Sequence, residues 1–316
     1  MEKGFKYTKR VLFFGMPDMG SICLARLVQE GVNIVGAVAP PPRTQTFLPF
    51  CELAQHMKLN LIIYKNSLKD ADFLEQIKKL NADVAIVCSY SKLFPEELLN
   101  TIPNRFVNVH PSILPKHRGP NPYSNVIING EEKTGITLHI MDKNFDTGDM
   151  LVTREINLEP NETMGSLFNK INYLAGELVV DFLRRFENVD DLKGQPQPEG
   201  DFPKAKEINV MKRENIIDWS KSALSIERFV RALNPFIAAM TYFRGLPIKV
   251  YSVRVLDKKI NAPAGTVLNA EKGLFVNTGD GIIEIRVVQA GTFFVGEGKE
   301  LIKHFEIKKG EKFDNG

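Results

Sequence analysis

Cysteine is scarce in this chain of 316 residues, which contains only Cys23, Cys51 and Cys88. The three are odd in number, far apart and without a C-x-x-C pair, which argues against both a disulfide framework and a zinc site. An H-E-x-x-H motif is absent as well. We therefore expect reduced, partly buried cysteines and no metal site.

Long apolar runs are also absent. Charged residues or prolines interrupt each run well before the length that a membrane-spanning helix requires. The N-terminal MEKGFKYTKR is basic, but the short strand-like VLFFGM follows it instead of the longer apolar segment of a signal peptide. We expect a cytoplasmic chain without a membrane partner, acting as a monomer.

The chain lacks a strong net charge, which is only +3. The charge is nevertheless divided unevenly: residues 1–203 contain 22 Lys and Arg against 25 Asp and Glu, whereas residues 204–316 contain 19 against 13. A basic C-terminal part hints at an anionic partner such as RNA. On charge alone, a solvated face rich in lysine explains the excess equally well.

What the first part of the chain does contain is an alternation of short apolar runs with helical patterns. Nearly continuous apolar runs are typical of parallel strands that helices cover on both faces. We expect strands at 11–16, 33–39, 61–64, 84–89, 106–110, 135–141 and 150–156, and helices near 19–30, 47–58, 70–80, 94–100, 121–129 and 163–186. This order predicts an α/β fold with a Rossmann-like, doubly wound, mostly parallel sheet, whose strand ends would hold the site.

The composition changes at residues 190–207, DDLKGQPQPEGDFPKAKE, which has the proline, glycine and charge content of an exposed linker. Beyond it we expect a helix at 221–233, followed by the short strand-like runs AMTYF, IKVYSVRVL, AGTVLNA, GLFVNT and GIIEIRVVQA. Such runs predict a small OB-like β-barrel, with a sandwich as the alternative. The expected division is a first domain at 1–189, a linker at 190–206 and a C-terminal β-barrel domain at 207–316.

The segment FVNVHPSILPKHRGP (106–120) carries the most chemical information. Asn108 and His110 stand one residue apart at the end of a predicted strand, so both side chains should point to the same face. An amide N–H can donate to a developing oxyanion while an imidazole transfers a proton. Alone, such a histidine is more often an ordinary hydrogen-bonded residue.

A carboxylate would be needed to orient and tune that imidazole. The turn after the next predicted strand, MDKNFDTGDM, supplies three candidates, namely Asp142, Asp146 and Asp149. Taken singly, turn aspartates more often cap helices or turns. Their combination with the N-x-H pair predicts a site that is complete without metal.

Together these motifs resemble the formyltransferases that use 10-formyltetrahydrofolate, whose site reads roughly N-x-H-x-S-L-L-P-x-x-R-G followed by a D-x-G turn. The opening FFGMPDMGSICL and the segment SYSKLFPEELL (89–99) are similar to further segments of that family. IDWSKSALSIERFVRALNP and GTVLNAEKGLFVNTGDG resemble the second domain of its methionyl-tRNA branch. The resemblance covers essentially the whole chain.

The resemblance implies a role for each catalytic residue. Asn108 would bind the carbonyl oxygen, His110 would stabilise the tetrahedral oxyanion or shuttle its proton, and Asp146 would orient His110 and assist proton removal from the attacking amine. The amine itself is the nucleophile, so no covalent enzyme intermediate is needed. The first domain would then be the catalytic one, with 10-formyltetrahydrofolate as co-substrate.

The resemblance also implies the folate contacts. They would come from the signature Ser112, Ile113, Leu114 and Pro115, in which Ile113 replaces the usual leucine at conserved volume, and from the backbone near Ser89, Tyr90, Leu93 and Asp142. His117 and His139 have no such support, and we interpret both as structural or surface residues.

The acceptor stays open at this point. Chain length and the C-terminal domain favour methionyl-tRNA, whereas the short loop 39–50 with its single cation Arg43, together with Pro111 and the run Asn121-Pro122-Tyr123, favours an amino sugar or another small amine. Water as acceptor would make the chain a formyltetrahydrofolate hydrolase. A non-catalytic nucleotide-binding module is disfavoured, because the turn GMPDMGS lacks the G-x-G-x-x-G fingerprint.

Overall fold

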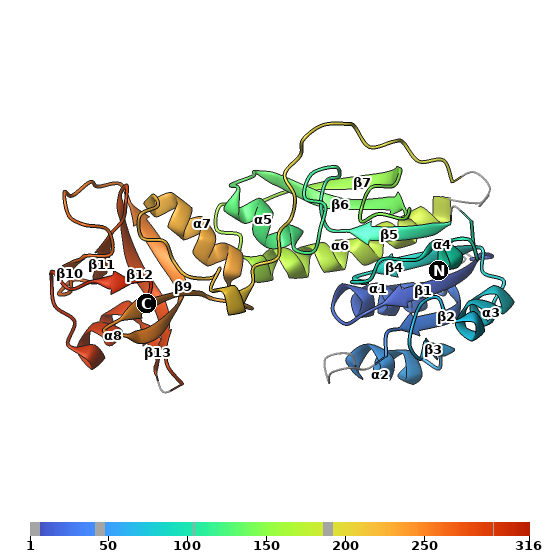
Figure 1. The fold of residues 1–316 in the computed structure, drawn as a ribbon, viewed down its shortest axis with the longest axis horizontal. Helices are drawn as coiled ribbons and strands as arrows, with labels where there is room; N and C mark the ends of the chain where they lie inside the picture. Colours follow the sequence, from blue (N-terminus) through green and yellow to red (C-terminus); the bar gives the residue numbers. More distant parts are fainter. Residues whose placement is uncertain (1–6, 42–47, 104, 186–191, 293) are drawn as a thin grey trace, which may run out of the picture. The chain divides into compact units, whose positions relative to one another are not determined.

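The computed structural model describes residues 7–41, 48–103, 105–185, 192–292 and 294–316. They form two compact units, each built around one sheet (Figure 1). Unit 1 comprises the described residues of Met1–Pro122, Lys133–Asn157 and Phe168–Ala205, and unit 2 those of Tyr123–Glu132, Leu158–Leu167 and Lys206–Gly316. The expected loop cation Arg43 lies outside the described residues.

The sheet of unit 1 has the strand order β3-β2-β1-β4-β5-β6-β7. The five strands from β3 to β5 run parallel, and β6 and β7 extend the sheet antiparallel. The strands are β1 (Arg10–Gly15), β2 (Asn33–Ala39), β3 (Leu61–Ile63), β4 (Val84–Cys88), β5 (Phe106–His110), β6 (Lys133–Ile140) and β7 (Met150–Asn157). The predicted doubly wound, mostly parallel sheet is confirmed.

Successive side chains of β1 point to opposite faces of this sheet and pack against helices on both sides. Phe13 faces Phe50 of α2, at 6.2 Å between ring centroids, whereas Phe14 packs with Phe94 in the core cluster that also contains Phe73 of α3. The helices of this part of the chain are α1 (Met19–Gln29), α2 (Leu48–His56), α3 (Ala71–Lys79), α4 (Glu96–Leu99), α5 (Pro122–Ile128) and α6 (Met164–Arg185). The strand order reverses between β1 and β4, the point at which sheets of this kind bind ligands.

The sheet of unit 2 is antiparallel, with the order β10-β11-β12-β9-β8-β14 and with β13 paired to β12. A bridge between Thr266 and Lys312 joins its two ends, so the sheet curls into a half-barrel, the predicted OB-like architecture. The strands are β8 (Ala239–Phe243), β9 (Leu246–Leu256), β10 (Val267–Asn269), β11 (Leu274–Asn277), β12 (Ile282–Ala290), β13 (Phe294–Glu297) and β14 (Phe313–Asp314). Helix α7 (Ala223–Leu233) packs on β9.

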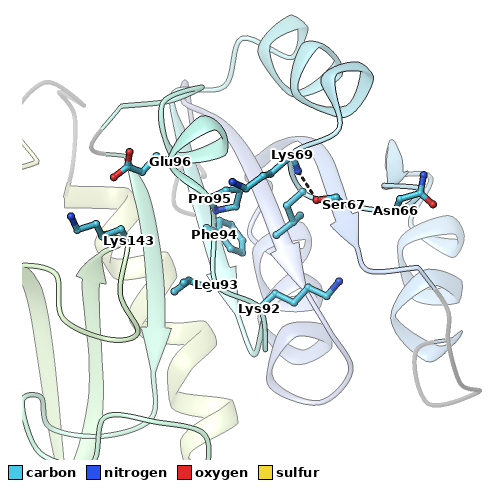
Figure 2. A pocket seen from close by; sticks show the side chains of 10 residues that line it. Asn66, Ser67, Lys69, Lys92, Leu93, Phe94, Pro95, Glu96 and Lys143 are labelled. Atoms are coloured by element: carbon cyan, nitrogen blue, oxygen red, sulfur yellow. Dashed lines mark hydrogen bonds between the residues drawn. The ribbon is translucent and has the colours of Figure 1, made fainter.

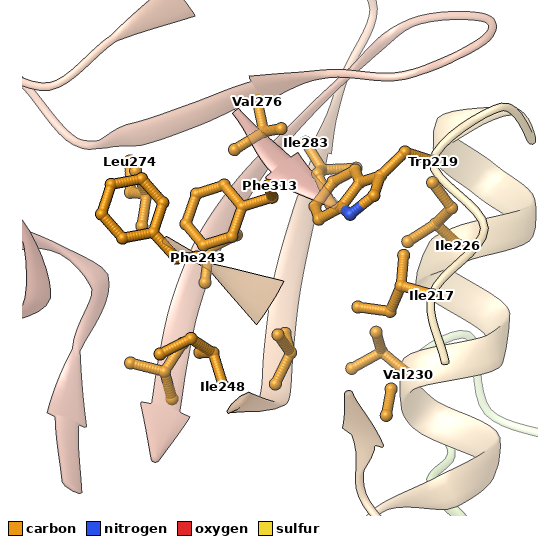
Figure 3. Close-up of a cluster of buried hydrophobic side chains, with 14 of the residues drawn as sticks. Ile217, Trp219, Ile226, Val230, Phe243, Ile248, Leu274, Val276, Ile283 and Phe313 are labelled. Carbon is orange, nitrogen blue, oxygen red and sulfur yellow. The ribbon is translucent and has the colours of Figure 1, made fainter. Parts of the chain in front are cut away.

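Aromatic rings fill the interior of the half-barrel (Figure 3). Phe313 lies 5.1 Å from Phe243 and 5.9 Å from Trp219 between ring centroids. The Trp219 indole N–H donates to the Thr241 hydroxyl at 2.9 Å, so the buried polar atom is satisfied. Burying each such ring stabilises the unit by about 1.5–3 kcal/mol relative to leaving it exposed.

Four elements of unit 2 were absent from the sequence-based prediction: the short 3-10 helix Val210–Lys212, β13, β14 and helix α8 (Gly298–Phe305). Strand β14 has two residues and β13 contains a glycine, so neither shows a β-rich run. Helix α8 did leave a signal, because Glu297 and Glu300 form a capping box in which each side chain binds the other residue's backbone N–H.

The segment at 192–205 lies along unit 1. Gln195 exchanges two backbone hydrogen bonds of 2.8 Å with Met150, and Ala205 N–H donates to the Arg118 carbonyl at 2.9 Å. The expected domain limits 1–189, 190–206 and 207–316 stay a prediction. Residues 190–191 of that expected linker lie outside the described residues.

Across the described ranges, no helix combines the length and the apolar character needed to cross a bilayer. The three cysteines are free and buried, in line with the expectation of reduced thiols. Burial raises the pKa of the Cys88 thiol, which keeps it protonated and unreactive.

Candidate active site

Strand β5 brings two of the predicted catalytic side chains together. Val107 and Val109 point into the core, so alternation turns Asn108 and His110 to the other face. In the antiparallel pairing with β6, Asn108 lies opposite His139 and His110 lies opposite Thr137. The floor of the site is therefore a patch of two neighbouring strands.

Asp146, in the turn between β6 and β7, is the centre of this patch. Its Oδ1 lies 3.3 Å from Asn108 Nδ2, 3.4 Å from His110 Nδ1 and 3.6 Å from His139 Nε2. Its Oδ2 accepts the backbone N–H of Gly119 at 2.9 Å. The structure thus brings the predicted residues Asn108, His110 and Asp146 together, with only 11% of the Asp146 side chain exposed.

His110 is placed between two acceptors. Its Nε2 lies 2.9 Å from the His117 carbonyl oxygen, while its Nδ1 faces Asp146. Burial lowers the pKa of His110, and the Asp146 carboxylate together with the His117 carbonyl opposes only part of this shift. The ring is therefore neutral at rest, but a proton that it receives would find an acceptor on each side.

The carboxyl of Asp146 keeps its charge despite burial. Desolvation acts to raise its pKa, but the hydrogen bond with His139, the neighbouring His110 and the Gly119 N–H outweigh it, so the pKa lies below its ordinary value. An ionised carboxylate beside a neutral imidazole can accept a proton from an amine and share it with the ring. An amide donor beside both can polarise a carbonyl oxygen.

The turn that carries Asp146 has a fixed shape. The Asp142 carboxylate accepts the Asn144 N–H at 2.9 Å and the Thr147 hydroxyl at 2.7 Å, while Asp146 itself adopts a left-handed backbone with φ of 56°. A Cβ on Gly148 would lie 1.8 Å from the Ile140 carbonyl oxygen, so only glycine fits there. Asp142 therefore shapes the turn.

The predicted folate signature forms a tight turn after β5. The Ser112 hydroxyl donates to the Lys116 carbonyl at 2.7 Å, and Leu114 N–H donates to the Thr137 hydroxyl at 3.2 Å. Ser112 and Leu114 are buried, whereas Ile113 and Pro115 are half-buried. The first two hold the turn together, and their contact with folate stays a prediction.

Three further predicted folate residues lie in the turn after β4, while Asp142 lies in the turn between β6 and β7, and its contact with folate stays a prediction. Ser89 is exposed, while the Tyr90 ring packs edge-on against Phe14 and Phe94 in the core. Leu93 is 46% exposed and lines a pocket of about 380 Å³ (Figure 2). The pocket is lined by Asn66, Ser67, Leu68, Lys69, Lys92, Leu93, Phe94, Pro95, Glu96 and Lys143.

Sequence reasoning missed two histidines of this site. His139 and His117 are each 2% exposed, which excludes the surface alternative and agrees with the structural one. His139 Nδ1 lies 2.9 Å from the Ile140 carbonyl oxygen, and its Nε2 lies 3.1 Å from Asn108 Nδ2. No local pattern marks His139; only the antiparallel pairing of β6 with β5 places it directly opposite Asn108.

The comparison with known proteins identifies the class. The chain matches the formyl transferase family over residues 11–183 and the C-terminal domain of formyl transferases over residues 209–304. The chain therefore belongs to the formyl transferase family, and the expectation of a formyltransferase enzyme with a formyltetrahydrofolate co-substrate is confirmed.

Individual relatives show which members of the family this chain resembles. The methionyl-tRNA formyltransferase of Clostridioides difficile is 35% identical over 288 residues, which are 89% of this chain and 92% of that protein. That of Acetivibrio thermocellus is also 35% identical, over 96% of this chain and 98% of its own.

Among solved structures, the sugar 3N-formyl transferase WlaRD shares the fold with a TM-score of 0.66 and 16% identity, covering 92% of this chain and all of its own. HypX from Aquifex aeolicus in complex with tetrahydrofolic acid has a TM-score of 0.60 and 18% identity, over 96% of this chain and 48% of its own.

Proposed function

We propose that this chain transfers the formyl group of 10-formyltetrahydrofolate to the amino group of initiator methionyl-tRNA. The observation that carries the acceptor is the similarity, at 30–35% identity and over most of both chains, to proteins named methionyl-tRNA formyltransferase. The basic residues 204–316 agree with an RNA acceptor. The predicted cytosolic location and monomeric state stay predictions.

In the reaction, the amine nitrogen forms a bond to the formyl carbon, and the bond from that carbon to the donor nitrogen breaks. Asn108 is the oxyanion donor in this proposal. Its amide nitrogen lies 3.1 Å from His139 Nε2 and donates to Asp146 Oδ1 at 3.3 Å, and this longer contact is the one that a carbonyl oxygen would replace.

The proton of the amine also needs a path. Asp146 is ionised and its side chain is 11% exposed against 5% for His110, so it accepts the proton first. His110, neutral and 3.4 Å away, can share the charge through its second acceptor, the His117 carbonyl. The proton is finally delivered to the donor nitrogen, which leaves the site as the tetrahydrofolate amine.

The pocket beside Leu93 suits the donor. Its volume of about 380 Å³ lies in the range of small-molecule sites, and Leu93 with Phe94 provides an apolar wall. Lys69, Lys92 and Lys143 line it as well, and cations fit the carboxylates of the donor's glutamate end. Lys143 stands three residues before Asp146 in the same turn.

Unit 2 contains two exposed arginines that could bind the phosphates of the acceptor. The largely buried Glu284 binds Arg254 at 2.7 Å and Arg286 at 3.3 Å, while these arginine side chains are 58% and 49% exposed. The carboxylate holds both guanidinium groups at the surface with donors left over for phosphate.

The second candidate is formyl transfer to an amino sugar or another small amine. The observation in its favour is Pro111 after His110 with the run 121–123, together with the fold shared with a sugar 3N-formyl transferase. Hydrolysis would use the same residues with water as acceptor.

One experiment separates these acceptors. Purified protein is incubated with 10-formyltetrahydrofolate and, in parallel, with charged initiator tRNA, with amino-sugar nucleotides or with buffer alone, and formylated product is quantified. We expect product with the tRNA and a much slower release of formate in buffer. Rapid formylation of an amino sugar, with none of the tRNA, would replace the proposed acceptor.

A further inference from the structure

The segment at 192–205 reaches the candidate active site through one side chain. Gln197 Nε2 donates to the carbonyl oxygens of Asp146 at 2.9 Å and of Gly148 at 2.8 Å. Its Oε1 accepts from Arg118 Nε at 3.0 Å and Arg118 Nη2 at 2.6 Å. A residue expected in an exposed linker therefore joins the two turns that flank the site.

We propose that Gln197 is a positioning residue, which holds the Asp146 turn in the geometry that its carboxylate needs for formyl transfer. The expected change in reaction rate rests on the proposed function, whereas the expected change in the Asp146 geometry does not. The contacts themselves belong to unit 1 throughout.

The turn needs such support because its backbone is unfavourable. Asp146 has a positive φ of 56°, which a residue with a Cβ adopts only when its surroundings enforce it. The carbonyl of this residue is one of the two that Gln197 binds. Holding the carbonyls on both sides of residue 147 fixes the direction in which the Asp146 side chain leaves the turn.

The segment that carries Gln197 is itself anchored at both ends. Gln195 pairs with Met150 at the start of β7, and a Cβ on Gly194 would lie 2.4 Å from the Asp149 Cβ, so the two backbones are in close contact. At the far end, His117 N–H donates to the Pro203 carbonyl at 2.6 Å. The His117 carbonyl in turn faces His110 Nε2, so the segment supports both partners of the acid and imidazole pair.

Both hydrogens of the Gln197 amide are used, and so is its oxygen. Glutamate has nearly the same size but cannot donate to the two carbonyls, and methionine fills the space without any polar group. Either substitution should leave Asp146 free to shift. Because displacements of about 1 Å can cost 10²-fold in rate, we expect kcat to fall about 10- to 100-fold with KM for the donor within about threefold of wild type.

A second measurement needs no substrate. Asp146 faces His110, His139, the Gly119 N–H and the Arg118 turn, and the first three stabilise its charge. In Gln197→Met the carboxylate would move away from them, so its pKa should rise toward the ordinary value, which a carbon-13 NMR titration of the aspartate carboxyls reports.

The matched controls are Gln195→Met and Gln195→Glu, because Gln195 is exposed and contributes backbone hydrogen bonds to the same segment. We expect wild-type kcat and titration from both. If Gln197→Met or Gln197→Glu lowers thermal stability yet keeps kcat and the Asp146 titration, Gln197 only ties the segment down and the inference is overturned. If the wild-type protein formylates no tRNA, the proposed acceptor fails, and the titration still decides the role of Gln197.

Discussion

At the scale of single residues, the site depends on one carboxylate that serves three partners. Asp146 Oδ1 approaches Asn108, His110 and His139, so a change in any partner alters the charge and direction of the same oxygen. Groups that act as a unit show non-additive losses when they are removed.

The catalytic prediction follows from this shared oxygen. Asn108→Ala, His110→Ala or Asp146→Asn should each lower kcat by about 10²-fold or more with little loss of folate binding. A double variant should lose far less than the product of the single losses. Steady-state rates and donor binding by fluorescence measure both, and a well-folded His110→Ala variant with full activity would end this assignment.

His110 also predicts a pH dependence of stability. Its folded pKa lies below the ordinary 6.5, so the unfolded chain binds the proton first as the pH falls. Stability from the neutral ring is full above about pH 6.5 and is lost below it, by at most about 1.4 kcal/mol per pH unit.

The comparison is between wild type and His110→Gln, whose free energies of unfolding in urea are measured from about pH 7.5 to 5. The variant should lose less stability over this range, because glutamine has no proton to gain. A difference that grows in favour of wild type as the pH falls would instead make the imidazolium the stable folded form.

At the scale of elements, the turn between β6 and β7 is as important as the strands beside it. Its shape comes from the Asp142 carboxylate, from Gly148 and from the Gln197 amide. The strands were predictable from their apolar alternation and the turn from its run of polar residues, but the choice of Asp146 among its three aspartates came only from resemblance to a family motif.

Gly148→Ala tests the turn. A Cβ would lie 1.8 Å from the Ile140 carbonyl oxygen, so the backbone must move, at a cost of about 1–3 kcal/mol in stability and more than tenfold in kcat. Gly31→Ala is the control, since Gly31 has a positive φ but open space around it. It should lower the melting temperature without lowering kcat, and equal kcat in both variants would show that the turn tolerates movement.

What sequence could not predict at this scale is long-range pairing. Asn108 and His110 were recognised because they share one strand, whereas His139 enters from β6, where a register shift follows Leu138. Gln197 lies in a stretch whose prolines and charges are typical of a solvated linker, and only its contacts show otherwise. The composition of a stretch indicates how exposed its residues are on average. It does not indicate which partners a single side chain contacts.

At the scale of the whole molecule, charge and fold are divided along the chain. Residues 1–203 hold the site and an acidic excess, and residues 204–316 hold a basic excess on an OB-like half-barrel. Phosphate contacts set affinity and its salt dependence, whereas the reacting groups set the rate.

Substituting Arg254 and Arg286 tests whether the basic C-terminal unit contacts the phosphates of tRNA. Arg254→Ala and Arg286→Ala should each raise KM for tRNA several-fold and flatten the logarithmic salt dependence of kcat/KM by about one unit per lost phosphate contact, while KM for the donor stays unchanged. Rates between about 50 and 200 mM salt measure the slope. Lys79→Ala on α3 is the control and should change neither value; an unaltered slope in both arginine variants would exclude them from the tRNA contact.

The interleaving of the two units governs how the protein is made. The chain passes between units five times, so α5 and the stretch Leu158–Leu167 emerge early but belong with residues made last. The Ser124 hydroxyl donates to the Ala232 carbonyl, and the Gly165 N–H donates to the Asn234 carbonyl. Neither hydrogen bond can form before these two acceptors have been synthesised. A nascent chain halted at residue 205 would therefore expose Val126 and Ile127, which are buried in the finished protein.

Expressed alone, residues 1–205 should aggregate or require a chaperone, and co-expression with residues 206–316 should recover both pieces as one complex. We therefore expect these two early stretches to complete their folding only after residues 206–316 have been synthesised.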